Sequence, residues 1–459
     1  MDPLHPRLTC YGGVGEIGGN KFLLEDRGAK VLLDFGSGFS DGSAYFDSNI
    51  SPRQVNGAGD LFEFGLLPEI PGLYSEQALQ NTRLKYRRPD VDAVVLSHYH
   101  WDHMGRIVHI DPQVPVYCGE TAALIHQAYS EASGSPLDGR EVRTFRTGDK
   151  FRVGPLEFVP VHVDHSIPGA YGFVVHTSEG ALAYSGDFRF HGPAGHMTGD
   201  FVSASHAEKP AVLLTEGTRV APGDATPNTS EKSVLREASK AVGETDKLVF
   251  STFRGNDVDR INTFYEAARR AGRRLVVSMK TALLLEKLAQ DKKLKVPKVG
   301  RDVDVYVRRK RSGRLEDSDY FPWERQLLDH GIAAEEVKRS QGKLFLHLEV
   351  WNFPELIDIG PEKGGTYIHA ATEAFNEEGE REEEIVRNWI DHMGFAYRQI
   401  HASGHAPMAE VEKLVNGIGA SRVVPVHTEH PEMFTELRRK GSWELNPPVR
   451  GKPIPVSPG

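Results

Sequence analysis

The sequence predicts an α/β protein, and two patterns along the chain indicate this class. In the first half, short apolar segments alternate with Gly-rich turns, which is typical of β-strands. From about Thr215 the pattern changes to an apolar segment, a turn and an amphipathic segment, and this unit repeats. Repeated βα units imply a parallel sheet. The 459 residues are enough for two or three domains, and 39% hydrophobic with 26% charged residues is ordinary for a globular protein.

The first half is expected to contain seven strands and few helices. Each apolar segment is short and ends at a turn or polar residue, as strands do. The segments are residues 20–25, 29–36, 91–97, 114–119, 156–163, 171–177 and 181–187. Residues 39–90 contain many Gly, Pro and Ser and are predicted to form a long loop region. Loops of this length are usually functional or an insertion.

The second half is expected to alternate strands and helices. The expected strands are residues 211–217, 247–253 and 273–279, and the helices that follow them are residues 233–242, 257–272 and 281–291. The sequence NTSE at residues 228–231 has the composition of a helix cap. Four further segments between residues 380 and 430 continue the alternation, and the Pro- and Gly-rich tail is expected to lie on the surface.

Charge and cysteine content narrow the classes of protein. A net charge of −9 disfavours a uniformly basic nucleic-acid-binding surface but leaves open a local basic groove. Cys10 and Cys118 are the only cysteines and form no CxxC pair, which disfavours a disulfide framework. The start of the chain lacks the features of a signal peptide, and there is no apolar run of about eighteen residues. We expect a cytoplasmic protein without a membrane partner.

The stretch SHYHWDHMG, which begins at Ser97, predicts a metal site. It places His98, His100, Asp102 and His103 in one short loop directly after an apolar strand. His98 and His100 are two residues apart, so on an extended segment both imidazoles project to the same side. Nitrogen and oxygen donors gathered in this way suit divalent zinc or manganese, and the sequence does not choose between them.

Three further residues complete the candidate ligand set. Four adjacent residues cannot fully enclose two ions, so additional ligands are expected elsewhere. His165, Asp187 and His427 each follow an apolar strand, and one edge of a sheet would collect them into a single site. Each of these histidines taken alone is more often an ordinary residue, but the set in this order predicts a site for two divalent metal ions.

With these residues in place, the sequence resembles the metallo-β-lactamase fold superfamily. The resemblance implies an αββα core. It also implies that His98, His100 and His165 hold one ion, that Asp102, His103 and His427 hold the other, and that Asp187 bridges both. Asp34 in VLLDFG would orient the ligand loop through hydrogen bonds. Two ions about 3.5 to 4 Å apart favour hydrolysis of a phosphodiester, although hydrolases of thioesters and lactams share the scaffold.

Three motifs of the second half resemble the β-CASP branch of this superfamily. They are Glu216 in LLTEGT, His405 in HASGHAP, and His427, at a position that is histidine in RNA-directed members and commonly valine in DNA-directed members. The resemblance implies an inserted β-CASP domain of parallel α/β structure. The predicted domains are residues 1–210 and 395–459 for the metallo-β-lactamase part and 211–394 for the insertion. His405 would protonate the leaving 3′ oxygen and Glu216 would accept a hydrogen bond from it, with Asp102 and Asp187 as the other catalytic residues.

The nearer resemblance is to the RNase J group, in its shorter archaeal-type form without an extra C-terminal domain. It rests on YGGVGEIGGN, DHSIPG, SGDFR, STFRGN, HASGHA and PVHTE and covers most of the chain. It implies a homodimeric 5′ to 3′ exonuclease that prefers single-stranded RNA with a 5′ monophosphate, with endonuclease activity open. Its 5′-phosphate pocket would use Ser278, Ser403, Lys280 and Arg254. Ser278 and Lys280 are equally compatible with a plain helix cap.

The sequence leaves three other functions open as alternatives. A β-CASP nuclease for DNA, or for both nucleic acids, is disfavoured by His427. A small-molecule metallo-hydrolase is expected to lack the inserted domain, and a non-catalytic RNA-binding subunit is expected to have lost metal ligands. The basic run VRRKRSGR, which begins at Val307, is a candidate for contact with an RNA backbone, but such a run is more often a solvated surface. Tyr306 and Tyr320 lie beside it and are expected to pack within the protein rather than to stack on bases.

Overall fold

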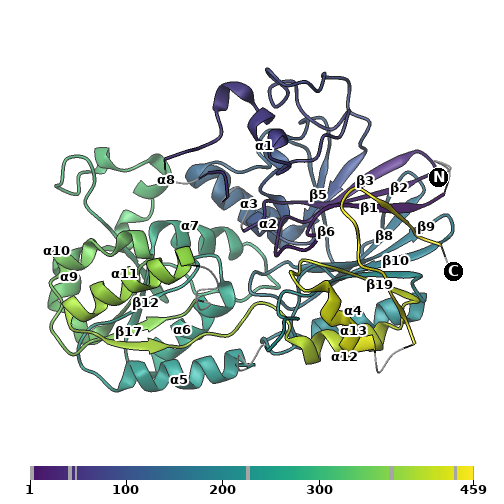
Figure 1. Cartoon of the computed structure of the whole chain (residues 1–459). Coiled ribbons are helices and arrows are strands. Elements are labelled where there is room, and N and C mark those ends of the chain that lie inside the picture. Colours follow the sequence, from purple (N-terminus) through teal and green to yellow (C-terminus); the bar gives the residue numbers. More distant parts are fainter. Residues whose placement is uncertain are drawn as a thin grey trace.

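The protein, in this computed structural model, forms three sheets. The structure describes residues 5–39, 44–46, 49–223, 228–371, 377–438 and 442–457. In these residues two seven-stranded sheets stack on each other, and the third lies beside them with its own helices (Figure 1). The last strands of the first two sheets, β19 to β21, come after all the strands of the third sheet in the chain. The fold is therefore a core domain with an inserted domain.

The first core sheet combines an antiparallel and a parallel half. Its order is β21 (Pro453–Pro455), β1 (Arg7–Gly12), β2 (Lys21–Asp26), β3 (Ala29–Phe35), β4 (Ala93–Val95), β5 (Val116–Gly119) and β6 (Val142–Phe145). Strands β3 to β6 run parallel. The C-terminal tail does not only cover the surface, because Ile454 of β21 pairs with Leu8 of β1.

The second core sheet collects strands from both ends of the insertion. Its order is β20 (Glu444–Leu445), β19 (Arg422–Val426), β11 (Val212–Glu216), β10 (Gly180–Tyr184), β9 (Tyr171–Thr177), β8 (Leu156–His162) and β7 (Phe151–Val153). Strands β10, β11, β19 and β20 are parallel. Their carboxyl ends therefore meet at one edge, where the polar residues that follow each strand come together.

Apolar side chains fill the space between the two core sheets. Phe22 and Val31 of the first sheet and Phe158 and Phe173 of the second belong to one apolar cluster, and these four side chains have no exposed surface. Helices α4 (Gly195–Glu208), α12 (Met408–Ile418) and α13 (Phe434–Arg438) pack on the outer face of the second sheet (Figure 1). Helices α2 (Trp101–Met104) and α3 (Glu120–Ser133) pack against the first. The predicted αββα core is confirmed.

The inserted domain is a parallel sheet with helices on both faces. Its strand order is β15 (Gly331–Ile332), β14 (Val303–Tyr306), β13 (Arg274–Ser278), β16 (Leu344–His347), β12 (Val249–Thr252), β17 (Thr366–His369) and β18 (Ala396–Gln399). All neighbours are parallel. One face carries α5 (Glu231–Gly243), α6 (Val258–Arg270) and α7 (Met279–Leu288). The other carries α9 (Ala334–Arg339), α10 (Glu355–Ile359) and α11 (Glu377–Met393).

Sheet membership differs from the predicted domain boundaries at both ends of the insertion. The sequence predicts residues 211–394 as the inserted domain, but β11 pairs with β10 and β19 in the core. Conversely, β18 lies beyond residue 394 and pairs with β17 of the inserted sheet. Both strands are parallel and followed by polar residues, so their sequences do not reveal which sheet they join. The helices α3 and α4, of fourteen residues each, add to the few expected in the first half.

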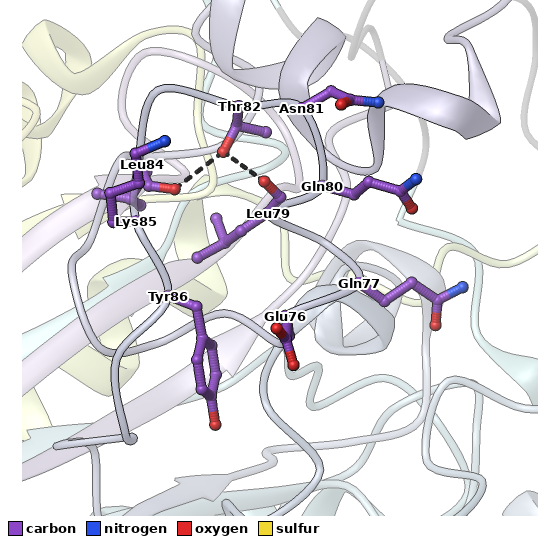
Figure 2. Close-up of a pocket in the computed structure, with 9 residues that line it drawn as sticks. All are labelled: Glu76, Gln77, Leu79, Gln80, Asn81, Thr82, Leu84, Lys85 and Tyr86. Atoms are coloured by element: carbon purple, nitrogen blue, oxygen red, sulfur yellow. Dashed lines mark hydrogen bonds between the residues drawn. The ribbon is translucent and has the colours of Figure 1, made fainter.

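The predicted loop region is packed, not extended into solvent. Apart from residues 40–43 and 47–48, which lie outside the described part of the chain, residues 39–90 include α1 (Gly59–Glu63), and Leu61, Leu67 and Leu73 are buried in the core cluster. A hollow of about 610 Å³ lies on this region (Figure 2). It is lined by Glu76, Gln77, Leu79, Gln80, Asn81, Thr82, Leu84, Lys85 and Tyr86. No helix in the described residues is long and apolar enough to cross a bilayer.

Candidate metal centre

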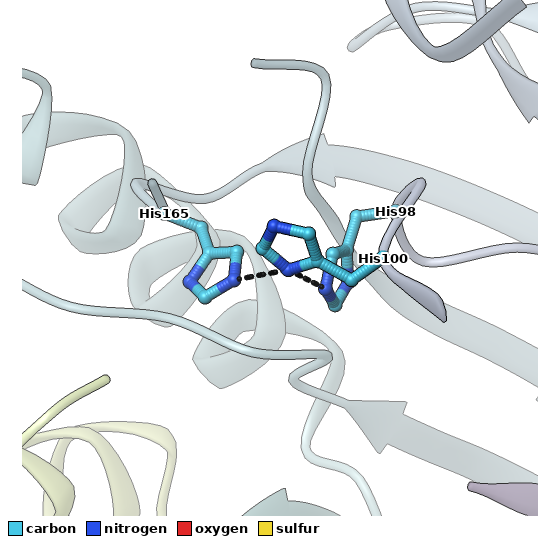
Figure 3. A group of neighbouring side chains, drawn as sticks. All are labelled: His98, His100 and His165. Carbon is cyan, nitrogen blue, oxygen red and sulfur yellow. Dashed lines mark hydrogen bonds between the residues drawn. The ribbon is translucent and has the colours of Figure 1, made fainter. Parts of the chain in front are cut away.

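Three buried imidazoles from two segments meet at the edge of the core sheets. After β4 the chain stays extended through His100, and α2 begins at Trp101. The Nε2 atom of His98 lies 3.0 Å from Nδ1 of His100, which in turn lies 3.0 Å from Nε2 of His165 (Figure 3). His98 and His100 thus present their nitrogens to the same side, as the spacing predicts, and His165 closes the group from the end of β8.

The surroundings keep these imidazoles neutral. Burial lowers the pKa of His98 and of His165 well below the ordinary value, and it lowers the pKa of His100 to about 3. A neutral imidazole offers a nitrogen lone pair, whereas an imidazolium does not. Three lone pairs that converge on one point form a donor set for a divalent cation.

A second cluster contains two carboxylates. Nε2 of His427 lies 3.0 Å from Oδ2 of Asp102, and Nε2 of His103 lies 3.0 Å from Oδ2 of Asp187. All four side chains are buried, and their donor atoms lie within 4.8 Å of one another. Burial favours the neutral imidazole of His103, but the carboxylates of Asp187, Asp102 and Asp34 outweigh it and raise the pKa of His103. The cluster is thus suited to positive charge.

Asp187, one of the four residues of the second cluster, also faces the first cluster. Its Oδ2 is 3.6 Å from Nε2 of His98 and 3.9 Å from Nε2 of His165 on one side, and 3.7 Å from Nε2 of His427 on the other. Its Oδ1 is buried and has no hydrogen-bond partner among the described residues. A buried carboxylate oxygen without a donor is unfavourable unless a cation neutralises it. The residues present therefore fit divalent metal ions.

Asp34 supports the ligand loop from behind. Its backbone has a positive φ of 57°. Oδ1 accepts from the backbone N–H of Ser97 at 2.7 Å, and Oδ2 lies 2.8 Å from Nδ1 of His103. The Tyr184 hydroxyl also donates to Oδ2, at 2.6 Å. A proton on Nδ1 of His103 leaves its Nε2 free to face Asp187, which is how a carboxylate sets the tautomer of a ligand histidine.

His405 and Glu216 form a pair beside the second cluster. Glu216 ends β11, and His405 lies in the loop between β18 and α12. Nδ1 of His405 is 3.0 Å from Oε2 of Glu216. Burial alone would lower the pKa of His405, but Glu216 and Asp187 outweigh it and raise this pKa to about 9. The imidazole is therefore positioned to carry a proton at neutral pH.

Thr218, which is not among the residues that the sequence predicts for the site, connects this pair to the second cluster. Its hydroxyl donates to Oε2 of Glu216 at 2.6 Å and lies 2.8 Å from Nδ1 of His427. A proton on Nδ1 of His427 would point at the hydroxyl, which keeps Nε2 directed at Asp102. The one signal in the sequence is its place two residues after Glu216 in TEGT.

The four candidate phosphate-binding residues lie in two places. Arg254 follows β12, and Ser278 and Lys280 lie where β13 meets α7; both sites belong to the carboxyl edge of the inserted sheet. A Cβ on Gly255 would lie 2.7 Å from Oγ1 of Thr281, so the two loops are in close contact. The Ser278 hydroxyl accepts from the N–H of Thr281 at 3.2 Å, which is the cap. Ser403 lies on the separate loop of His405.

The basic run after Val307 is largely paired within the inserted domain. Lys310 donates to Glu324 at 2.6 Å, Arg309 to Glu335 at 3.1 Å, and Arg308 to Asn352 at 3.0 Å. Tyr306 and Tyr320 are buried, with hydroxyl partners in Glu355 and the Arg308 carbonyl. Both tyrosines pack inside the domain, as expected.

Comparison with known proteins agrees with the architecture. Residues 69–238 match the beta-lactamase superfamily domain, and residues 396–445 match the Zn-dependent metallo-hydrolase RNA specificity domain. The chain is 26% identical to ribonuclease J of Pyrococcus abyssi over 96% of this chain and 94% of that protein. It is 25% identical to ribonuclease J of Sinorhizobium meliloti over 85% of this chain and 68% of that protein.

A solved structure supports the fold alone. The crystal structure of a protein of unknown function from Enterococcus faecalis superposes with a TM-score of 0.77 at 19% sequence identity, covering 98% of this chain and all of that one. Taken with the sequence matches, the chain carries a metallo-β-lactamase domain and an RNA specificity domain and is similar to ribonuclease J over most of its length.

Proposed function

We propose that this protein, which is similar to ribonuclease J over most of its length, is a metal-dependent ribonuclease that degrades single-stranded RNA from a 5′-monophosphorylated end. The broader part, a metal-dependent hydrolase that acts on RNA, follows from the two domain matches and the curated relatives. The observation that carries the proposal is the position of the His405–Glu216 pair directly beside a buried set of possible metal ligands, in which the Asp187 carboxylate faces both groups of imidazoles.

The centre would hold two divalent ions, zinc or manganese. His98, His100 and His165 would hold one ion, and Asp102, His103 and His427 the other, with Asp187 touching both because its carboxylate lies between the two groups. Bound ions would supply an activated water at neutral pH and stabilise charge on the attacking and leaving oxygens. The imidazoles and carboxylates of this chain fix the geometry in which that chemistry occurs.

His405 would act as the general acid. Its Nδ1–H is held by Glu216, so the ring is fixed and the other nitrogen is left for the leaving 3′ oxygen. The raised pKa keeps the imidazole protonated at neutral pH, as a proton donor requires. After transfer, Glu216 would stabilise the ring until it regains a proton from solvent.

The inserted domain would select the 5′ end. Arg254 and Lys280 are exposed cations at the carboxyl edge of the inserted sheet, next to the capped start of α7, and edges of this kind commonly receive phosphate groups. Ser278 and Ser403 would add hydroxyl donors. We also propose a cytoplasmic location and a homodimer, which rest on the resemblance to ribonuclease J.

A time course on end-labelled RNA tests the proposal. The substrates are one single-stranded RNA with a 5′ monophosphate, triphosphate or hydroxyl, and a DNA of the same sequence. We expect early mononucleotides from the monophosphorylated RNA only, and none with a His103→Ala control. Internal fragments regardless of the 5′ group would contradict the 5′-end assignment, and equal attack on DNA would contradict the RNA preference. If the metal-loaded protein leaves the RNA intact, the function itself is wrong.

A further inference from the structure

We propose that Arg189 is a positioning residue that holds the His405 loop in register with the metal ligands by tying it to the inserted domain. This inference rests on the proposed function, because it assigns Arg189 a role in placing the general acid. Arg189 follows Asp187 by two residues in SGDFR, and its side chain is buried where the core and inserted domains meet.

The guanidinium of Arg189 reaches three segments that meet only in the folded protein. Its NH1 donates to the backbone carbonyl of Ser403 at 3.0 Å, two residues before His405. Its Nε donates to Asp164, the residue before His165, at 3.2 Å. Its NH2 donates to Asp259 in the first turn of α6 at 2.6 Å. One side chain therefore joins the segment that carries His165, the loop that carries His405 and helix α6 of the inserted domain.

The surrounding charges reinforce this joint. Glu231 of α5 lies 3.7 Å from Arg189 and pairs with the buried Arg260 at 2.9 Å. Arg260 in turn donates to the Ala402 carbonyl at 3.3 Å, on the same loop as Ser403. Two arginines supported by the inserted domain thus bind successive carbonyls of the loop that carries His405. His191 adds a further contact to the Ser403 carbonyl at 3.0 Å.

The local backbone is shaped to receive the arginine. A Cβ on Gly192 would lie 2.3 Å from Nε of Arg189 and 2.5 Å from the carboxylate oxygens of Asp164, so only glycine allows the chain to close over this pair. The three donors of Arg189 point in fixed, different directions, which suits a planar guanidinium and not the single ammonium of lysine. The arrangement is therefore specific to arginine.

Two substrates separate positioning of the acid from general damage. RNA has a poor leaving group, a 3′ alkoxide, and needs the proton of His405, whereas bis(p-nitrophenyl) phosphate has a leaving group that departs without one. We expect Arg189→Met to lower kcat on RNA by about 100-fold, within the range attributed to a general acid. Hydrolysis of the activated ester should fall far less, and metal content should stay at the wild-type level.

A second inter-domain arginine provides the matched control. Arg146 of the core pairs with Asp291 of the inserted domain at 2.9 Å and with Glu120 at 2.6 Å, but it does not contact the His405 loop through these bonds. Arg146→Met removes a comparable ionic link between the domains. We expect it to leave the ratio of RNA to activated-ester turnover unchanged.

Asp259→Asn covers the case in which Arg189→Met fails to fold, because it weakens only the link to α6. Asp259→Asn should lower the ratio of RNA to activated-ester turnover by a smaller factor than Arg189→Met does. Arg189→Lys should bring this ratio only part of the way back to the wild-type value. Equal losses on both substrates, or the same shift in Arg146→Met, would overturn the positioning role. If the wild type hydrolyses the ester but not RNA, the proposed function fails instead, independently of Arg189.

Discussion

The core and the inserted domain each gather polar residues at the carboxyl edge of parallel strands, but the two edges differ in depth. At the core edge Asp34, Asp187, Glu216 and His427 are buried and fixed by hydrogen bonds. At the inserted edge Arg254 and Lys280 are exposed. The same topological rule thus yields a buried donor set for cations in one domain and exposed cations suited to phosphate in the other.

Asp187→Ala should have the largest effect, because Asp187 contributes to both clusters of the buried edge. We expect loss of bound metal and of all RNA hydrolysis. Metal analysis of the purified variant checks this. Asp26→Ala is the control, since Asp26 is equally buried but its carboxylate, among the described residues, accepts from the backbone N–H and the hydroxyl of Ser178 and contacts no candidate metal ligand. It should lower stability by about 1 to 3 kcal/mol and keep the metal. Two ions retained in Asp187→Ala would refute the bridging role.

His405→Ala should come next and separate proton donation from metal binding. General acids typically contribute about two to four orders of magnitude, so kcat on RNA should fall by that factor. Metal content should remain, because His405 lies beyond the two proposed ligand groups. Steady-state kinetics with metal analysis on the same preparation test both expectations. Normal turnover would remove His405 from the mechanism.

Thr218→Val tests the link between the buried ligands and the acid. Valine has nearly the same shape but removes the hydroxyl that joins Glu216 and His427. Supporting residues of this kind typically change activity or metal affinity by about 10- to 100-fold, and we expect a loss in that range. Thr218→Ser keeps the hydroxyl and should retain most activity. Equal activity of both variants would show that the link has no catalytic consequence.

Lys280→Ala should have a smaller effect, confined to the 5′ end. Loss of one charged contact to a phosphate is worth about tenfold, so the preference for a 5′ monophosphate over a 5′ hydroxyl should shrink by about that factor. Lys287→Ala is the control, because Lys287 lies on the same helix but pairs with Glu131. A uniform loss on both substrates would assign Lys280 to RNA binding in general.

The smallest expected effect is the change of kcat for RNA hydrolysis with pH, which reports on the His405–Glu216 pair. The acid form of His405 is required, so kcat should fall as pH rises through its pKa. Glu216 and Asp187 raise this pKa to about 9, and bound cations would offset part of the Asp187 contribution. We therefore expect a basic limb between the ordinary value of 6.5 and about 9. A pH–rate profile measures it, and the same limb in His405→Ala would assign it to another group.

The chain alone is enough to predict a candidate metal centre. His98 and His100 face the same side because residues two apart in an extended segment must do so. A helix cap at Ser278 is compatible with the sequence because capping depends on a few neighbouring residues, and the Ser278 hydroxyl does accept from the N–H of Thr281. Both features depend on residues only two or three positions apart in the chain, so they can be predicted from the sequence.

Tertiary structure decided what depends on distant contacts. Assigning β11 to the core and β18 to the insertion depended on which strands they pair with. Thr218 and Arg189 acquired their roles from partners such as His427 and Ser403, which lie about two hundred residues away. The sequence by itself therefore determined which chemical groups are present and where each strand ends. Only the folded structure decided which of those ends meet, because burial and hydrogen bonding join segments whose order in the chain does not specify their neighbours.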